Sequence, residues 1–160
     1  MAKHASPVTA AIRMLKERNI PFTEHPYKYE DKGGTHVSAT ELGVDEHGVI
    51  KTLIMEDEEK RPLVVLMHGD KQVSTKELAR IAGVKRIGAC SPETAYKHSG
   101  YLVGGTSPFG TKKTMPVYME ETIADLPRIY INGGRRGYLV GIDPKDLMDL
   151  LKPVSVKVAI

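Results

Sequence analysis

Residues 49–68 of the chain read VIKTLIMEDEEKRPLVVLMH. Two apolar runs, Val49–Glu56 and Leu63–His68, flank the highly charged segment Asp57–Pro62. Apolar runs of this length around a polar turn are typical of a β-hairpin. The sequence therefore predicts a hairpin at this position, in the middle of a sheet.

Strand-like and helical segments are interleaved on both sides of this hairpin. Further strands are expected at Pro21–Tyr27, Met115–Met119, Arg128–Asn132, Tyr138–Ile142 and Val154–Val158. Helices are expected to begin at Ser6-Pro7, Ser38, Ser74, Ser91 and Asp143, and the first four to end near Arg18, Gly43, Gly83 and Gly100. Two strand pairs are joined by turns shorter than the crossover of about a dozen residues that parallel strands need, so the sheet must be mixed. The sequence predicts a single mixed α/β domain over residues 1–160, with a partly antiparallel, curled sheet flanked by helices.

The composition excludes several classes of protein. The chain has 160 residues, of which 23 are basic and 20 acidic, and the net charge of +3 permits nucleic-acid binding without arguing for it. The longest apolar run, Leu63–Met67, is far shorter than the roughly 20 residues of a membrane-spanning helix. The first seven residues lack the apolar core of a secretory signal. We therefore expect a cytoplasmic protein with no membrane association.

Signatures of metal sites and of protein nucleophiles are missing. The six histidines show neither HxH nor HExxH spacing, so no metal and no cofactor are expected. Cys90 is the single cysteine; it cannot form an intramolecular disulfide and is expected to pack as a small buried residue. Cys90, Ser91 and Ser107 lie in no nucleophile-elbow signature, although a triad assembled across space remains open.

The most unusual stretch, Gly104–Lys113, reads GGTSPFGTKK. It differs from a nucleotide-binding phosphate loop because Thr111 stands where lysine is required, and because Pro108 lacks an amide hydrogen. ATP or GTP hydrolysis is therefore rejected.

Glycines in series let backbone N–H groups approach a developing negative charge, and Thr106 and Ser107 add two hydroxyls. The alternative is a tight turn between strands, with Lys112 and Lys113 simply solvated.

Lys51 is the one cation in the first apolar run of the hairpin. Strand alternation puts Leu53 and Met55 on its side of the strand, which favours a cleft over open water. Such a lysine can bind a phosphate or polarise a carbonyl group. The alternative is a solvent-facing lysine on an edge strand.

The segment Asn132–Gly137 reads NGGRRG and is typical of a hairpin turn, since Asn-Gly and Gly-Gly accept positive φ. Arg135 and Arg136 project from this turn. If they converge in space with Lys112-Lys113 and with Lys85-Arg86, these basic pairs form a phosphate-binding rim.

Three motifs stand in a characteristic order: Lys51-Thr52, the Gly-Gly-x-Ser-Pro-x-Gly segment of residues 104–110 with Lys112-Lys113 after it, and the Gly-Gly-x-Arg-Gly turn of residues 133–137. In this set the chain resembles the YbaK family, which shares its domain with the editing insertion of bacterial prolyl-tRNA synthetases. The resemblance covers essentially the whole chain and implies a YbaK-like fold.

The resemblance implies a free-standing editing enzyme that hydrolyses the ester of a mischarged tRNA, with Cys-tRNA(Pro) as the leading substrate. In the cysteine-specific members the thiol of the substrate attacks the ester, so no cofactor is implied. Lys51 would hold the terminal adenosine or its phosphate, and the amides of the segment beginning Gly104-Gly105 would stabilise the carbonyl oxygen as it becomes anionic. The residues implied to bind the substrate are Tyr27, Thr52, Thr106, Ser107, Pro108, Asn132, Gly133 and Gly134, and those implied for the tRNA rim are Lys112, Lys113, Arg135 and Arg136.

Several alternatives stay open. Asn132 and Leu139 stand where thiol-selective members have a small hydroxyl residue and an acid, so a deacylase for Ala, Ser or Thr is also compatible with the sequence. A non-catalytic tRNA-binding module and a hydrolase for another small ester or thioester are further alternatives. The small net charge and the lack of an anticodon-reading module predict weak tRNA selectivity, improved by association with a prolyl-tRNA synthetase.

Overall fold

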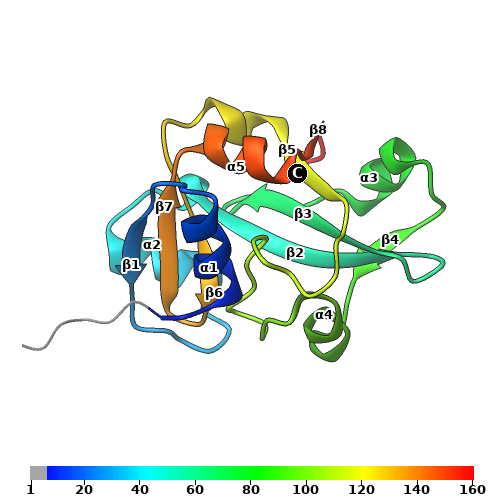
Figure 1. Ribbon diagram of the computed structural model, residues 1–160. Coiled ribbons are helices and arrows are strands. Elements are labelled where there is room, and N and C mark those ends of the chain that lie inside the picture. Colours follow the sequence, from blue (N-terminus) through cyan, green and yellow to red (C-terminus); the bar gives the residue numbers. More distant parts are fainter. Residues whose placement is uncertain (1–6) are drawn as a thin grey trace, which may run out of the picture.

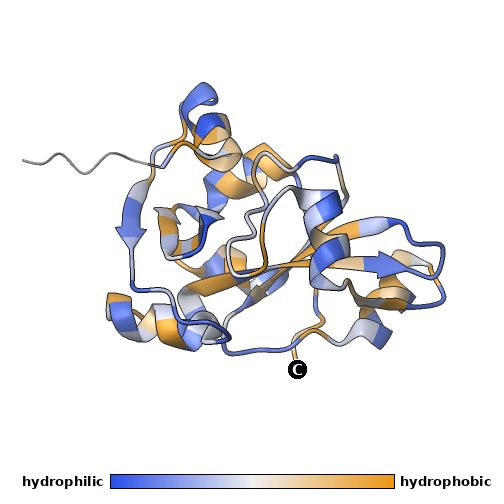
Figure 2. Ribbon diagram, turned by 90° about the horizontal axis from the view of Figure 1, so that it is seen from below, coloured by the Kyte–Doolittle hydropathy of each residue, from blue (hydrophilic) through white to orange (hydrophobic). Residues whose placement is uncertain are grey.

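The hairpin at the centre of the sheet is confirmed in the computed structural model, which describes residues 7–160. Strand β2 (Val49–Asp57) pairs antiparallel with β3 (Pro62–His68), and Lys51 lies opposite Met67. Both faces of this hairpin are covered by other elements, which explains why its two strands are continuous apolar runs. Figure 2 shows the hydrophobic strands and the hydrophilic turn that joins them.

The other strands extend this hairpin into an eight-stranded mixed sheet of order β1-β7-β6-β2-β3-β5-β8, with β4 paired to β2 outside that path. Their bounds are β1 Thr23–Pro26, β4 Ile87–Ala89, β5 Val117–Glu120, β6 Ile129–Arg135, β7 Tyr138–Ile142 and β8 Val154–Val156. The β2–β6, β3–β5 and β5–β8 pairs are parallel and the other four pairs are antiparallel. The sheet is strongly twisted, because β6 and β7 run at a steep angle to β2 and β3, and its path does not close into a barrel (Figure 1).

Five α-helices flank the sheet: α1 Ala10–Glu17, α2 Gly34–Leu42, α3 Thr75–Ala82, α4 Pro92–Ser99 and α5 Pro144–Leu151. The predicted N-caps of α3, α4 and α5 are confirmed, since Ser74, Ser91 and Asp143 each accept a hydrogen bond from a first-turn amide. Short 3-10 helices cover Glu46–Gly48 and Glu121–Asp125.

Two predicted helix starts differ from the structure. The prediction that Ser38 caps a helix is wrong, because α2 already begins at Gly34 and the Ser38 hydroxyl donates to the Thr35 carbonyl 3.1 Å away. Ser6 lies outside the described residues. The N-cap of α1 is Thr9, whose hydroxyl accepts a hydrogen bond from the Ile12 amide at 3.1 Å.

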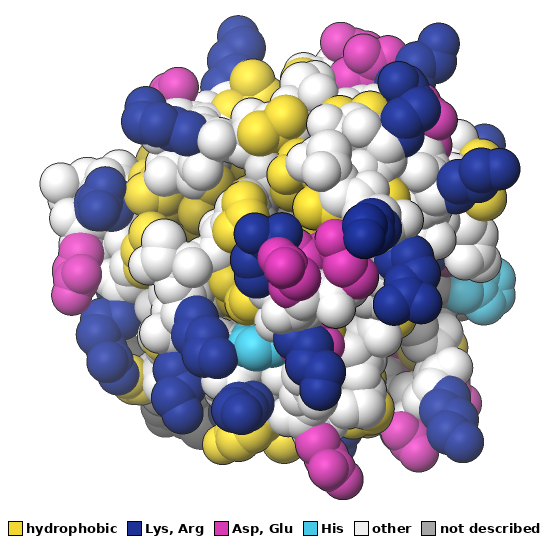
Figure 3. Space-filling model, turned by 90° about the vertical axis from the view of Figure 1, so that its right-hand side faces the viewer, with side chains coloured by type: hydrophobic (Ala, Val, Ile, Leu, Met, Phe, Trp, Pro, Cys, Tyr) yellow, Lys and Arg dark blue, Asp and Glu magenta, His cyan; other side chains and the backbone are white. Residues whose placement is uncertain are grey.

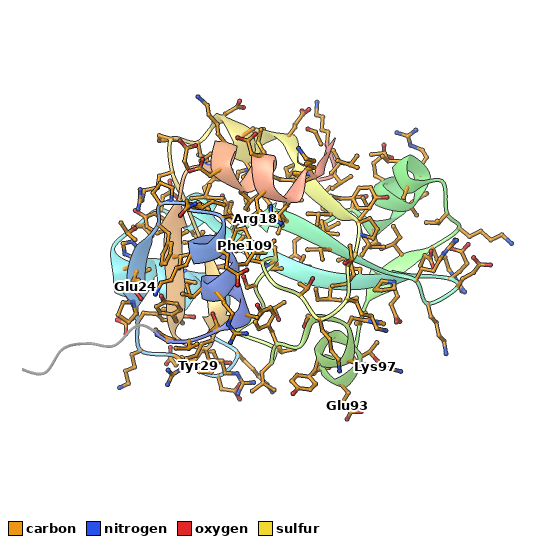
Figure 4. All side chains as sticks on the ribbon, viewed as in Figure 1. Arg18, Glu24, Tyr29, Glu93, Lys97 and Phe109 are labelled. Carbon is orange, nitrogen blue, oxygen red and sulfur yellow. The ribbon has the colours of Figure 1, made fainter. Side chains whose placement is uncertain are left out.

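The glycine-rich segment is anchored to the core by Phe109, which has no exposed surface. Figure 4 shows this ring in the interior beside α1. The Tyr101 hydroxyl donates to the Phe109 carbonyl at 2.6 Å, and the Gly110 amide lies 3.1 Å from the Met14 sulfur. The segment is therefore held to the interior at Phe109 and Gly110.

No helix within residues 7–160 combines the length and the apolar character that crossing a bilayer requires.

Candidate active site

A cavity of about 680 Å³ opens at a gap in the sheet. On one edge, β2 pairs with β6 at Val49–Ile50 and with β4 from Met55 to Asp57. Within the described chain, residues 51–54 therefore have no strand partner on this edge, and side chains from both faces of β2 can border the opening. The volume is that of a typical small-molecule site.

The cavity brings together distant parts of the chain, among them β2, the glycine-rich segment, the β6–β7 hairpin, the loop after β1, α2 and the segment from the end of β4 into α4. The sequence-predicted residues that border it are Tyr27, Lys51, Thr52, Gly104, Thr106, Asn132 and Arg136. Residues of all three sequence motifs thus meet at one place.

Other predicted residues lie behind the wall. Ser107 is completely buried, and its hydroxyl accepts a hydrogen bond from the Phe109 amide at 3.2 Å. A Cβ atom on Gly105 would lie 2.8 Å from the backbone nitrogen of Arg136, and a Cβ atom on Gly133 would lie 2.5 Å from the Tyr138 ring. The two glycines therefore allow close packing of the wall. None of Ser107, Gly105, Gly133, Pro108 and Gly134 borders the cavity.

Asn132 joins the hairpin turn to the glycine-rich segment. Its Nδ2 donates to the Gly104 carbonyl at 3.1 Å, and its Oδ1 accepts from the amides of Gly134 at 2.7 Å and Arg135 at 3.0 Å. One side chain therefore fixes the position of Gly104 relative to β6.

The backbone amides of the glycine-rich segment differ in their partners. The Gly105 amide donates to the Leu102 carbonyl at 2.8 Å. The amides of Gly104 and Thr106 have no acceptor within residues 7–160, and both residues border the cavity. An anionic oxygen in the cavity could accept from such unpaired donors.

Lys51 and Thr52 supply the cavity with two further polar groups. The Lys51 ammonium donates to the Lys71 carbonyl at 2.6 Å. The Thr52 hydroxyl is buried and has no partner in the described part of the chain. A buried hydroxyl without a partner is unfavourable, so a polar ligand that paired with it would gain binding energy. Burial raises the pKa of the Tyr27 hydroxyl, which keeps it protonated and able to donate.

Tyr29 borders the cavity and was not predicted from the sequence. It lies in the loop after β1, at the lower edge of the view in Figure 4. The Arg136 guanidinium carbon lies 5.3 Å from the centre of the Tyr29 ring. The two-residue spacing from Tyr27 was the one available signal, because an extended chain places such residues on the same side.

The basic pairs have different neighbours. Arg136 borders the cavity, whereas Lys113 lies in a separate pocket, where its ammonium is 3.0 Å from His98 Nδ1. The amides of Lys85 and Arg86 donate to the Glu58 carboxylate in the β2–β3 turn. Figure 3 shows Lys and Arg mixed with Asp and Glu over the side of the molecule at the right of Figure 1.

Potential metal-ligand atoms of Glu56, Cys90 and His98 lie within 4.8 Å of one another, a grouping that the histidine spacing could not show. The Lys113 ammonium can only donate, so Nδ1 of His98 accepts, and its Nε2 donates to Glu56 at 2.8 Å. This positive charge opposes a cation at the cluster. Burial, together with Glu56, raises the pKa of the Cys90 thiol to about 11.

The fold and the cavity define an α/β protein with a polar site at a gap in its mixed sheet. Among the described residues, this site offers an ammonium, a buried hydroxyl and unpaired amides, which are the groups that a small polar or anionic ligand would need. Residues 32–150 match the aminoacyl-tRNA editing domain, and the chain belongs to that family. The resemblance seen in the three sequence motifs is confirmed.

Individual relatives agree with this assignment. The chain is 28% identical over 149 residues to EbsC of Enterococcus faecalis, which carries the name of a candidate Cys-tRNA(Pro)/Cys-tRNA(Cys) deacylase; the match covers 92% of this chain and 91% of EbsC. It is 33% identical over 107 residues to a proline–tRNA ligase of Thermodesulfovibrio yellowstonii, covering 64% of this chain and 18% of the ligase.

The fold is also found in a solved structure. The crystal structure of a candidate trans-editing enzyme for prolyl-tRNA synthetase superposes with a TM-score of 0.82 at 21% identity, over 97% of this chain and 99% of the other. This likeness confirms the predicted mixed α/β fold.

Proposed function

We propose that the protein is a trans-acting aminoacyl-tRNA deacylase, with Cys-tRNA(Pro) as its leading substrate. The observation that carries the proposal is the shared cavity, which Lys51, Thr52, Gly104 and Thr106 all border. Within the described residues, the amides of Gly104 and Thr106 have no acceptor. Family membership and the name of EbsC support the same activity.

The amides of Gly104 and Thr106 are the proposed donors to the ester carbonyl oxygen. As the carbonyl carbon becomes tetrahedral, negative charge grows on this oxygen and strengthens hydrogen bonds from fixed donors. Loss of one such donor lowers the rate of comparable enzymes by about 10²–10³-fold. Gly105 keeps its neighbours in place through its hydrogen bond to the Leu102 carbonyl.

The proposed nucleophile is the thiol of the substrate. Ser107 is buried behind the cavity wall, and the Cys90 thiol stays protonated near neutral pH. The cysteinyl sulfur attacks its own carbonyl carbon, the C–S bond forms and the C–O bond to the ribose breaks. The thiol proton passes to the ribose oxygen, and water then opens the released four-membered thiolactone to give cysteine.

Lys51 is proposed to hold the 3′-terminal nucleotide through its phosphate or ribose. To do so, the ammonium exchanges the Lys71 carbonyl for the ligand. Tyr27 and Thr52 are proposed to contact the aminoacyl group, whereas Asn132, Gly133, Gly134, Ser107 and Pro108 position the wall around it.

A deacylase for Ala, Ser or Thr is the second candidate, supported by Asn132 and Leu139 at the positions where thiol-selective members differ. Such an enzyme would need an activated water, because those substrates carry no thiol. The rates for Cys- and Ser-charged tRNA separate the two mechanisms, since the substrates differ mainly by sulfur for oxygen.

Single-turnover deacylation of proline tRNA charged with Cys, Ser, Ala or Pro tests the proposal. We expect the Cys ester to be hydrolysed fastest and the Pro ester to be spared. Hydrolysis of none of the four esters above the buffer rate contradicts a deacylase. A Lys51→Ala variant with unchanged rates contradicts the proposed site and favours a tRNA-binding module.

The proposed partners are proline tRNA and prolyl-tRNA synthetase, in the cytoplasm, with residues 1–160 acting as a single editing domain without a cofactor. Pull-down of the synthetase with the protein, in the presence and absence of tRNA, tests the association. Failure to co-purify even with tRNA contradicts it.

A further inference from the structure

We infer that Tyr29 and Arg136 form a stacking site for the unpaired base at the 3′ end of the tRNA, beside the cavity. The inference rests on the proposed function and deepens it. It assigns the base to a subsite separate from Lys51, and Lys51 then holds the phosphate or the ribose.

The geometry of the pair is that of a cation–π contact. The Arg136 guanidinium carbon lies 5.3 Å from the centre of the Tyr29 ring, and both residues border the cavity. Arg136 is exposed and Tyr29 is half-buried, so the pair is open to a ligand from the solvent side. Planar guanidinium and phenol groups are the surfaces on which proteins stack unpaired bases.

Neighbouring segments contact both side chains. Arg136 Nε donates to the Val103 carbonyl at 2.8 Å. A Cβ atom on Gly104 would lie 2.6 Å from the Tyr29 hydroxyl, and one on Gly137 would lie 2.8 Å from the Tyr27 carbonyl and 3.5 Å from the Tyr29 Cβ. Two glycines therefore make room for the Tyr29 segment, and the Arg136 side chain is already hydrogen-bonded before a ligand arrives.

The location matches the shape of an aminoacylated nucleoside. Its base and its ester are joined through one ribose, so a single site must hold both within the reach of one nucleoside. Gly104 meets this condition because it lies against Tyr29 and borders the cavity, and its amide has no acceptor among residues 7–160.

The surroundings also suit a nucleotide. Leu102 and Val103, which precede the glycine-rich segment, are exposed at 57% and 46%, and Val103 borders the cavity. They provide apolar cover beside the positive charge of Arg136, the combination that single-stranded nucleic-acid sites use. Stacking reads the face of a base and not its edge, so this subsite would accept the tRNA end independently of the amino acid attached.

Binding of an uncharged oligonucleotide tests the inference without any chemistry. The probe is a 5′-fluorescein RNA of sequence ACCA, compared by fluorescence anisotropy with the same RNA lacking the 3′-terminal base. We expect the wild type to bind the complete RNA about 5- to 150-fold more tightly, the range that one stacked base contributes.

Three variants assign this preference to the pair. Tyr29→Leu removes the aromatic face and Arg136→Lys keeps the charge but not the plane, and each should abolish the preference; Tyr29→Phe should keep it. Arg128→Lys is the matched control, because Arg128 lies 5.9 Å from the Tyr130 ring and neither residue borders the cavity. Thermal unfolding of each variant checks that it is folded.

Equal binding of the two RNAs by the wild type, or binding of neither, overturns the stacking site. An equal loss of preference in Arg128→Lys also overturns it. Deacylation without a base preference overturns the stacking site alone. A base preference without deacylation of any ester supports the stacking site and contradicts the proposed deacylase.

Discussion

Replacing Gly104 by alanine tests the construction of the cavity. Gly104 has φ of +90°, a conformation that costs a residue with a Cβ about 1–3 kcal/mol. The added methyl carbon would also lie 2.6 Å from the Tyr29 hydroxyl and 3.0 Å from a ring carbon, so the ring must shift by roughly 1 Å. A misplacement of about 1 Å near reacting groups can lower a rate about 10²-fold.

Gly83→Ala is the matched control. Gly83 has φ of +74°, but a Cβ atom there would meet no atom within 4 Å, and the residue does not border the cavity. We expect both variants to lose about 1–3 kcal/mol in urea-induced unfolding. Single-turnover deacylation should fall about 10- to 100-fold in Gly104→Ala only. Unchanged deacylation in Gly104→Ala, or an equal fall in Gly83→Ala, would refute the reasoning.

Three further predictions follow from individual side chains. Lys51→Ala should slow single-turnover deacylation about 10- to 150-fold, which is the value of one charge-assisted hydrogen bond. Lys71→Ala keeps the backbone carbonyl that Lys51 contacts and should leave the rate unchanged, so equal rates in the two variants would argue against a role for the ammonium. Phe109→Ala should lower the free energy of unfolding in urea by about 3–5 kcal/mol. Leu102 is 57% exposed, so Leu102→Ala should lower it by less than about 0.5 kcal/mol, and similar losses in the two variants would contradict the anchoring role of Phe109. Burial holds the pKa of the Cys90 thiol at about 11, so the thiol is protonated at neutral pH. The rate of its alkylation by iodoacetamide should therefore rise about tenfold per pH unit towards pH 11, and a plateau of this rate below pH 9 would contradict the burial.

Most of the fold could be predicted because its signals are local. The β2–β3 hairpin, the caps of α3, α4 and α5, and the need for a mixed sheet follow from runs of a few residues. Strand β4 was missed because Ile87–Ala89 is too short to show alternation. The start of α2 was misplaced because a capping-box pattern at Ser38 falls inside the helix, where the side chain is buried.

The candidate site could be predicted only in part. Lys51, Gly104 and Asn132 lie in recognisable motifs, and the structure brings all three to one cavity. Tyr29 lies in a loop without a motif, and its contact with Arg136 joins segments more than a hundred residues apart. Such a pair leaves no local pattern in the sequence.

From the sequence alone one obtains the inventory of strands and helices and the chemical groups available for catalysis, because periodicity, capping and turn chemistry act over a few residues. Only the tertiary structure decides which of those groups meet. Within residues 7–160, it leaves part of β2 without a strand partner between β6 and β4, leaves the amides of Gly104 and Thr106 without an acceptor, and directs the Lys113 ammonium to His98. Each of these features depends on how distant segments pack, and packing is a property of the whole chain.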